Sequence, residues 1–207
     1  MEKIILIATS NEGKVREMEK AFAGLPIRLV PLSRIHEILP DASEIKEPVE
    51  DGATFMENAC IKARRYREQT GLAALADDSG LAVEALDGAP GVRSARYAGM
   101  HGDDAANNAK LIADLRICGE ENAVAAYHCA LVLALEDGHE LTAEGTCSGY
   151  IRPEARGTGG FGYDPYFYLS DGRSMAELTR EEKHEISHRG TALKRMKVQL
   201  EKFLRTR

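Results

Sequence analysis

Residues 3–32, KIILIATSNEGKVREMEKAFAGLPIRLVPL, decide the fold class. The uninterrupted apolar run that opens this stretch is typical of a strand buried on both faces. After a polar turn, apolar residues recur at steps of three and four and predict an amphipathic helix: Val15, Met18, Phe22 and Leu25. Residues 27–32 predict a second strand. A strand, a loop, a helix and a strand in this order predict an α/β fold.

The rest of the chain adds signals for both parallel and antiparallel strands. Thr54 and Glu57 have the spacing of a capping box and predict a helix from Phe55 to about Glu68. The dipeptide Asp137-Gly138 predicts a hairpin turn between two long strands, 123–136 and 140–150. Further short strands are expected at 72–76 and 81–86, separated by an Asp77-Asp78-Ser79-Gly80 turn, and further helices at 104–115 and at the C-terminus. Together these signals predict a twisted mixed sheet flanked by helices.

Composition narrows the class of protein. A chain of 207 residues suits one domain over residues 1–207, with or without a small lobe. The net charge of −6 argues against a nucleic-acid partner, because such proteins usually carry a basic excess. The N-terminus lacks the pattern of a signal peptide, and no apolar run is long enough to span a membrane, so we expect a cytoplasmic protein without a membrane partner. The four cysteines lack the spacing of a zinc site and are expected to be buried free thiols.

The first candidate site is the loop Thr9–Lys14, which follows a strand and opens a helix. Free backbone amides and the helix dipole favour an anion at such a position. The polar side chains of Thr9, Ser10 and Asn11 and the charge of Lys14 suit a phosphate. The alternative is an ordinary turn in which Ser10 or Asn11 caps the helix.

Two acidic segments form the second candidate site. Glu47-Pro48-Val49-Glu50-Asp51 precedes the capped helix, and Asp77-Asp78 follows a buried strand. Mg²⁺ prefers carboxylate oxygens, and usually takes one or two from the protein beside water and substrate phosphate. The alternative is a solvated acidic stretch and an aspartate-capped turn.

Basic and glycine-rich segments complete the candidates. Several cations could converge on a polyphosphate: Lys62, Arg93, Arg96, Lys183, His188 and Arg189. In the segment 159–165, glycines permit close approach of backbone to a ligand, Phe161 could stack on a base and Asp164 could accept hydrogen bonds. Scattered surface charge and a turn before an aromatic core strand are the alternatives.

Taken in order, these motifs resemble the inosine triphosphate pyrophosphatase family, also described as dITP/XTP pyrophosphatases. The resemblance spans nearly the whole chain and is carried by six segments: 8–14, 55–63, 76–81, 90–99, 159–165 and 176–189. It implies an elongated α/β fold with a long twisted mixed β-sheet flanked by helices, two lobes around a central cleft, and a homodimer. It also implies Mg²⁺-dependent hydrolysis of a purine nucleoside triphosphate such as ITP, dITP or XTP to the monophosphate and pyrophosphate.

The resemblance also implies roles for particular residues. Phosphates would be held by Thr9, Ser10, Asn11, Glu12, Gly13 and Lys14. Glu50 would bind the metal, although Glu47 and Asp51 lie close by in the sequence. Asp78 would accept a proton and bind the metal as well. The remaining substrate contacts would come from Lys62, Ser79, Phe161, Gly162, Tyr163, Asp164, Lys183, His188 and Arg189.

Two other functions compete with this interpretation. One is a pyrophosphatase for modified pyrimidine nucleotides on a similar fold, which a substrate panel separates from a purine enzyme. The other is a nucleotide- or nucleic-acid-binding regulator, against which the negative net charge and the pair Glu50 and Asp78 argue.

Overall fold

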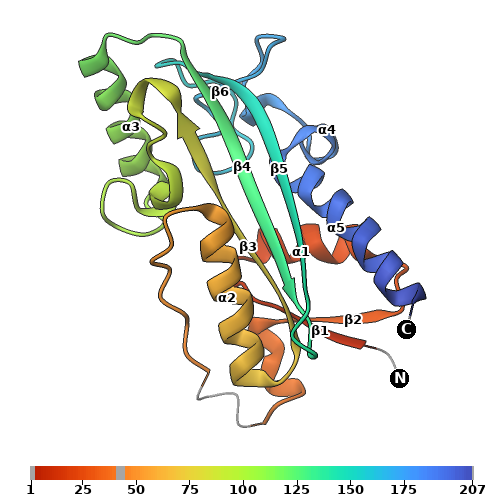
Figure 1. Ribbon diagram of the computed structural model, residues 1–207. Helices are drawn as coiled ribbons and strands as arrows, with labels where there is room; N and C mark the ends of the chain where they lie inside the picture. Colours follow the sequence, from red (N-terminus) through yellow and green to blue (C-terminus); the bar gives the residue numbers. More distant parts are fainter. Residues whose placement is uncertain (1–2, 41–44, 207) are drawn as a thin grey trace. The chain divides into compact units, whose positions relative to one another are not determined.

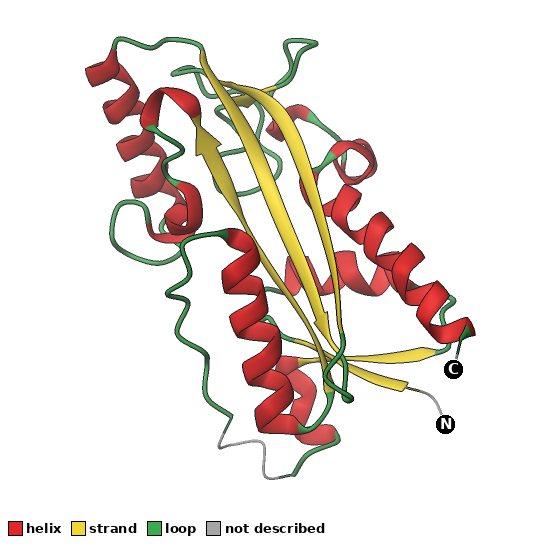
Figure 2. Cartoon of the chain, viewed as in Figure 1, coloured by secondary structure: helices red, strands yellow, loops and turns green. Residues whose placement is uncertain are grey.

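The computed structural model describes residues 3–40 and 45–206 of the chain (Figures 1 and 2). The chain divides into two compact units. The first unit comprises Met1–Asp78, Ala130–Glu144 and Ala192–Arg207, and the second comprises Ser79–Cys129 and Gly145–Thr191. Each unit is therefore assembled from separate stretches of the chain. The assignment of residues 1–207 to one functional domain stays a prediction.

The strands form a six-stranded sheet in the order β2-β1-β3-β4-β5-β6. Parallel pairing joins β1 (Lys3–Ile7) to β2 (Ile27–Pro31) and to β3 (Ala73–Val83). The long strands β4 (Ala123–Ala134) and β5 (Glu140–Ile151) follow, and β5 pairs antiparallel with the short β6 (Phe167–Tyr168). The predicted α/β class and mixed sheet are confirmed.

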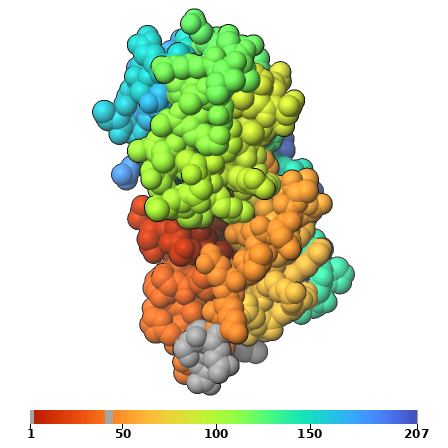
Figure 3. Space-filling view, turned by 90° about the vertical axis from the view of Figure 1, so that its left-hand side faces the viewer, coloured from red at the N-terminus to blue at the C-terminus, as the bar shows by residue number. Residues whose placement is uncertain are grey.

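The first unit is organised around the parallel strands and helices α1 (Glu12–Phe22) and α2 (Phe55–Thr70). Helix α1 buries Val15, Met18 and Phe22, as its periodicity predicts, but it ends before Leu25. One core cluster packs Ala59 and Ala63 of α2 with Leu6 and Ala74 of the strands. Side chains of the N-terminal residues (red) and of the α2 region (orange) share one surface of this unit (Figure 3).

The second unit has a core of its own. Helix α3 (Asp104–Cys118) buries Leu111 and Leu115 against residues of β4 and β6, including Tyr127 and Phe167. Helix α4 (Arg180–Ile186) follows β6. Helix α5 (His188–Arg205) begins in this unit, and from Ala192 onward it belongs to the first unit.

The prediction of a turn at Asp77–Gly80 is wrong. Residues 73–83 form one continuous strand, and the expected strand at 81–86 ends at Val83, after which Glu84–Leu86 form a 3₁₀ turn. A run of polar residues usually marks a turn, but Asp77 and Asp78 are buried here, and both carboxylates have cationic partners. Paired carboxylates can stay inside a strand because their burial is compensated.

Two predictions drawn from composition can be compared with the structure. All four cysteines are free, as expected, but only Cys129 and Cys147 are buried, whereas Cys118 is exposed and Cys60 is half-buried. None of the helices in the described part of the chain is sufficiently long and apolar to cross a membrane.

The capping box of α2 allows a test of the local sequence signal. Thr54 Oγ1 accepts a hydrogen bond from Glu57 N at 3.1 Å, and Glu57 Oε2 accepts from Thr54 N at 3.2 Å. Replacing Thr54 with alanine should lower the free energy of unfolding by about 1 kcal/mol, the usual cost of losing such a cap. Urea denaturation measures this change. Thr54→Ser keeps the hydroxyl and should recover most of the loss; equal destabilisation by both substitutions would contradict the capping role.

Candidate active site

The register of the parallel strands places two of the predicted segments beside each other. Ile7, the last residue of β1, lies opposite Leu75 of β3, and Ala8 N donates to Leu75 O at 2.8 Å. The loop after β1 and the acidic pair after Leu75 therefore lie at the same edge of the parallel strands. Open α/β sheets bind their ligands beyond the carboxyl ends of such strands.

The loop Thr9–Lys14 forms the N-terminus of α1. Asn11 is the N-cap, and its Oδ1 accepts hydrogen bonds from Gly13 N at 2.9 Å and Lys14 N at 3.1 Å. The capped turn, which is the alternative for this segment, is thus present. Ser10, Asn11 and Glu12 are exposed. Phosphate binding by this loop stays a prediction.

Asp77 belongs to the acidic segment of the second candidate site, but the sequence assigned it no role of its own. Its side chain is fully buried, and its Oδ1 accepts from Lys14 Nζ at 2.5 Å. Asp77 and Asp78 contact different helices, because neighbouring side chains of a strand point to opposite faces of the sheet. Because of this alternation, Asp77 pairs with Lys14 of α1, and Asp78 faces α2.

Asp78 belongs to a cluster with α2 and the acidic segment before it. Lys62 Nζ lies 3.0 Å from Glu50 Oε2 and 3.4 Å from Asp78 Oδ1. Of the three acids that the sequence offers here, Glu50 is the one in this ion pair, whereas Glu47 and Asp51 are exposed. The structure therefore brings Glu50, Lys62 and Asp78 together.

Asn58 fixes this cluster from inside. It is 1% exposed, its Nδ2 donates to Asp78 Oδ2 at 3.1 Å and its Oδ1 accepts from Gly52 N at 2.8 Å. A Cβ at position 52 would lie 2.7 Å from that same Oδ1, so the close approach requires glycine. One buried amide thus holds both Asp78 and the segment that carries Glu50. Its position one helical turn before Lys62 places the two side chains on the same face of α2.

Burial and charge shift the pKa values in this cluster. Burial raises the pKa of Asp78, and Glu50 and Asp77 add to that rise, while Lys62 and the hydrogen bond from Asn58 oppose it; the net shift is upward. Burial lowers the pKa of Lys62, but Asp78, Asp77 and Glu50 together outweigh burial, and the net shift is again upward. Lys62 therefore stays protonated, and Asp78 is a stronger base than an ordinary aspartate.

The donor set fits a divalent cation. The ammonium of Lys62 lies within hydrogen-bonding distance of both Glu50 and Asp78, so these two carboxylates converge on a space that already holds one positive charge. Across residues 3–40 and 45–206, no three His, Cys, Asp or Glu side chains form a complete metal cage. Mg²⁺ does not need such a cage, because it commonly takes two carboxylates, water and substrate phosphate.

The second unit holds the other group of predicted residues. Asp164 is 3% exposed and accepts from Phe161 N at 2.8 Å, from Tyr127 Oη at 3.3 Å and from Lys183 Nζ. Lys183 Nζ also lies 4.7 Å from the centre of the Phe161 ring, which is 53% exposed. Gly160 has a φ of +76°, and a Cβ there would overlap the Asp164 carboxylate. The exposed ring is therefore held by a buried ionic network.

Three further predicted residues of this unit are held by side-chain contacts. Arg189 donates to Ser79 Oγ at 2.9 Å, and the His188 ring stacks on Tyr127 with centres 4.9 Å apart. Both His188 and Arg189 are buried. Burial, helped by Asp164, raises the pKa of Tyr127 well above 10, so its hydroxyl remains a donor.

The predicted residues therefore fall into two groups, one in each unit. The first group contains Thr9–Lys14, Glu50, Lys62 and Asp78, and the second contains Ser79, Phe161–Asp164, Lys183, His188 and Arg189. Tyr163 differs from its neighbours, because it is 4% exposed and its hydroxyl donates to Ser94 O at 2.8 Å. Arg93 is exposed and Arg96 is half-buried in the 3₁₀ segment Gly91–Arg96, and their roles stay predictions.

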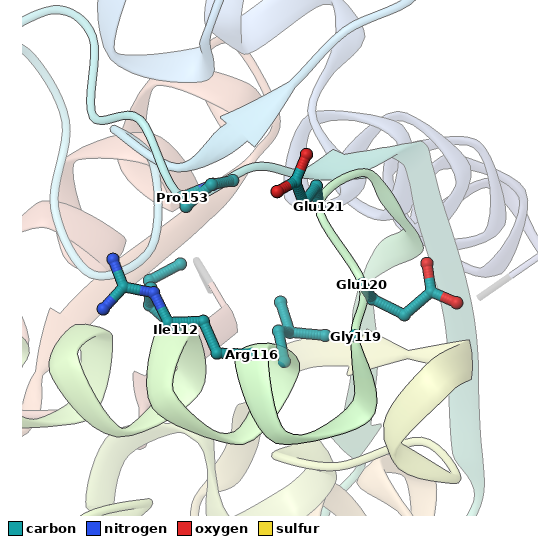
Figure 4. A pocket seen from close by; sticks show the side chains of 7 residues that line it. Ile112, Arg116, Gly119, Glu120, Glu121 and Pro153 are labelled. Atoms are coloured by element: carbon teal, nitrogen blue, oxygen red, sulfur yellow. The ribbon is translucent and has the colours of Figure 1, made fainter.

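A surface pocket at the end of α3 lies apart from these predicted residues. It has a volume of about 260 Å³, and Pro153 and Glu121 face Ile112 and Arg116 across it (Figure 4). Leu115, Gly119 and Glu120 complete its lining. Since none of the predicted site residues lines this pocket, it is not the candidate active site.

Comparison with known proteins identifies relatives over nearly the full chain. A sequence model of the Ham1 family matches residues 5–199. A dITP/XTP pyrophosphatase from Geobacter sulfurreducens is 48% identical over 197 residues, which cover 95% of this chain and 96% of the relative. A dITP/XTP pyrophosphatase from Geobacillus kaustophilus is 46% identical, with 98% and 96% covered.

Solved structures agree with the sequence comparisons. The structure of a HAM1 protein from Coxiella burnetii superposes with a TM-score of 0.87 at 40% identity and covers 97% of this chain and 99% of that one. A nucleoside-triphosphatase and dITP/XTP pyrophosphatase from Mycobacterium abscessus gives a TM-score of 0.75 at 46% identity, with 92% and 96% covered. The resemblance inferred from the motifs is confirmed.

The raised pKa of Asp78 predicts how stability depends on pH. Because the folded protein binds this proton more tightly than the unfolded chain, ionised Asp78 lowers stability as the pH rises above the ordinary value of 3.8. Asp78→Asn should therefore raise the Tm of the metal-free protein at neutral pH, and the gain should shrink as the pH falls toward 3.8. Thermal denaturation with a chelator across this range measures the effect.

The matched control is Asp51→Asn, which changes an exposed acid in the neighbouring segment. It should leave the Tm nearly unchanged at every pH. A gain from Asp78→Asn that does not depend on pH, or an equal gain from Asp51→Asn, would contradict the assignment of the destabilisation to the buried carboxylate.

Proposed function

The chain belongs to the Ham1 family, and on that premise we propose that it hydrolyses deaminated purine nucleoside triphosphates to the monophosphate and pyrophosphate. Relatives that are 46–48% identical over nearly the whole chain are dITP/XTP pyrophosphatases. The observation that carries the proposal is the convergence of Glu50 and Asp78 on Lys62 beside the loop that opens α1. Carboxylates that can bind a cation, a lysine and a helix N-terminus are the parts that a polyphosphate requires.

Glu50 and Asp78 would hold Mg²⁺ in this enzyme. The ion would supply charge stabilisation on the phosphate oxygens when bound. Lys62 would remain beside these two carboxylates, and its ammonium would neutralise charge on the phosphate oxygens. Asn58 would keep both carboxylates in register, because its amide contacts Asp78 and the segment before α2 at the same time.

The loop Thr9–Lys14 would bind the phosphates. Thr9 and Ser10 supply hydroxyls, the first turn of α1 supplies amides and the positive end of its dipole, and Lys14 supplies a charge fixed by Asp77. Charge stabilisation by donors that are already in place is usually the largest part of catalysis.

Asp78 would act as the proton acceptor. A water molecule attacks phosphorus, its proton passes to the carboxylate of Asp78, and the bond to the pyrophosphate leaving group breaks. The upward pKa shift improves Asp78 as a base near neutral pH, because proton transfer is most efficient when the pKa approaches the working pH. Lys14 and Lys62 would stabilise the charge that develops on the phosphate oxygens.

The second group of residues would contact the nucleoside. Phe161 has the exposure that stacking on a base needs, and Asp164 and Lys183 hold its backbone and ring. His188 and Arg189 would donate hydrogen bonds to O6 of the purine, with Ser79 and Tyr127 limiting their movement. Adenine carries a donor at that position, so it would leave these groups unpaired. Gly162 and Tyr163 would shape the same loop.

The proposal includes expectations about the metal, the assembly, the location and the partners of the protein. We expect Mg²⁺ as the metal, a homodimer as the assembly and the cytoplasm as the location. We expect neither a nucleic-acid nor a membrane partner, in keeping with the net charge of −6.

A nucleotide panel tests the function. Pyrophosphate release should be fast with ITP, dITP and XTP and should require Mg²⁺, whereas ATP should be poorer by as much as ~10⁴-fold in kcat/KM because its 6-amino group mismatches the donors. Modified pyrimidine nucleotides in the same panel test the competing activity. Equal turnover of ATP and ITP would disprove the proposed base recognition, and preference for a pyrimidine would disprove the substrate class.

The substitution Asp78→Asn distinguishes an enzyme from a protein that only binds the nucleotide. It should lower kcat for ITP by roughly 10²–10⁴-fold, the usual contribution of a general base, while ITP binding measured by calorimetry is retained. Asp51→Asn, the exposed neighbour, should leave kcat unchanged. Retained turnover in Asp78→Asn would remove Asp78 from the role of proton acceptor.

A further inference from the structure

Helix α3 contacts the glycine-rich loop through two residues that are not among the predicted site residues. Asp104 Oδ2 accepts a hydrogen bond from Gly162 N at 2.7 Å, and Asn108 Nδ2 donates to Gly162 O at 2.9 Å. Residues four apart lie on the same face of a helix, so one face of α3 grips both polar groups of a single residue. We call Asp104 and Asn108 the α3 clamp.

The clamp acts on the backbone next to Phe161. Gly160 and Gly162, on either side of Phe161, have φ values of +76° and +61°. Glycine gives a loop this conformation at the cost of conformational freedom, so such a loop needs contacts to stay in one shape. Asp164 fixes the N–H of Phe161 and the clamp fixes the N–H and C=O of Gly162, while the ring itself is 53% exposed and gains little from burial.

Neither clamp residue is the N-cap of α3. The N-cap of α3 is the preceding residue, Asp103, whose side chain accepts from Ala106 N at 3.0 Å. Asp104 is exposed, so it contributes little to the core. The Oδ1 of Asn108 is buried and has no hydrogen-bond partner among the described residues, which costs stability. The hydrogen bond from Asn108 to Gly162 O fixes the orientation of this amide and offsets part of that cost.

We propose that Asp104 and Asn108 are positioning residues that hold Phe161 in the orientation in which it stacks on the purine base. The inference rests on the proposed function, because it assigns the base to Phe161. The two residues touch the loop and not the substrate. Loss of the clamp should therefore weaken recognition of the base and leave the acidic cluster of the first unit unaltered.

The test uses Phe161→Trp as its parent protein. The chain contains no tryptophan, so this substitution provides a single indole, excited selectively beyond the absorption of the tyrosines, at the proposed stacking position. Asp104→Ala in this parent should lower the fluorescence anisotropy of the introduced indole without nucleotide, and weaken its quenching by IMP. The KM for ITP should rise roughly tenfold, as expected for one lost hydrogen bond to a charged group, while kcat changes much less. Asn108→Ala should act in the same direction.

Two controls separate positioning from general destabilisation. Asp103→Ala removes the cap of the same helix and should lower the Tm without changing the anisotropy or the KM. Asp104→Asn retains an acceptor oxygen and should restore most of the parent's behaviour. Unchanged anisotropy and quenching in both Asp104→Ala and Asn108→Ala would overturn the proposal, as would an equal rise in KM from Asp103→Ala.

Failure of the proposed function is distinguishable from failure of the clamp. If the wild-type chain released no pyrophosphate from any purine nucleotide, the proposed function would fail. The anisotropy of the introduced indole in the ligand-free variants would still decide whether α3 positions the side chain at this place in the loop, because that measurement needs neither a substrate nor turnover.

Discussion

Two adjacent buried carboxylates inside a strand are the constraint on which the first unit depends. An uncompensated buried charge costs several kcal/mol, so Asp77 and Asp78 can occupy β3 only if cations and donors reach them. Strand alternation sends one carboxylate toward α1 and the other toward α2. Lys14, Lys62 and Asn58 meet them there. The placement of α1, α2 and the acidic segment is thereby tied to the chemistry of two neighbouring residues.

The same compensation leaves the cluster poised for a ligand. Asp78 keeps a raised pKa although Lys62 lies nearby, because burial and the charge of Glu50 outweigh the lysine and Asn58. Like charges that are buried close together repel each other and destabilise the folded protein when no cation is bound. A divalent cation would relieve that repulsion, which is the physical link between the strain of this cluster and the metal chemistry proposed for it.

Much of the fold could be predicted from the sequence, and the failures share a cause. The helices α1, α2 and α3, the hairpin strands and the capping boxes are local features, set by residues within a few positions of each other. The continuity of β3 through Asp77-Asp78-Ser79-Gly80 was missed because its reason is not local: the partner of Asp77 lies 63 residues away, and the partners of Asp78 lie 16 and 20 residues away. Asp104, Asn108 and Tyr127 were missed for the same reason, because their partners lie 58, 54 and 37 residues away.

By itself the sequence determined the α/β class, the order of the elements and, through ordered motifs along nearly the whole chain, the family. It also determined which residue types were available for metal and phosphate. Only the tertiary structure decided that Glu50 and not Glu47 or Asp51 joins Lys62, and that α3 grips Gly162. Periodicity and capping depend on neighbours in the chain, whereas the choice of a distant partner depends on strand register and helix packing, which exist only once the chain has folded.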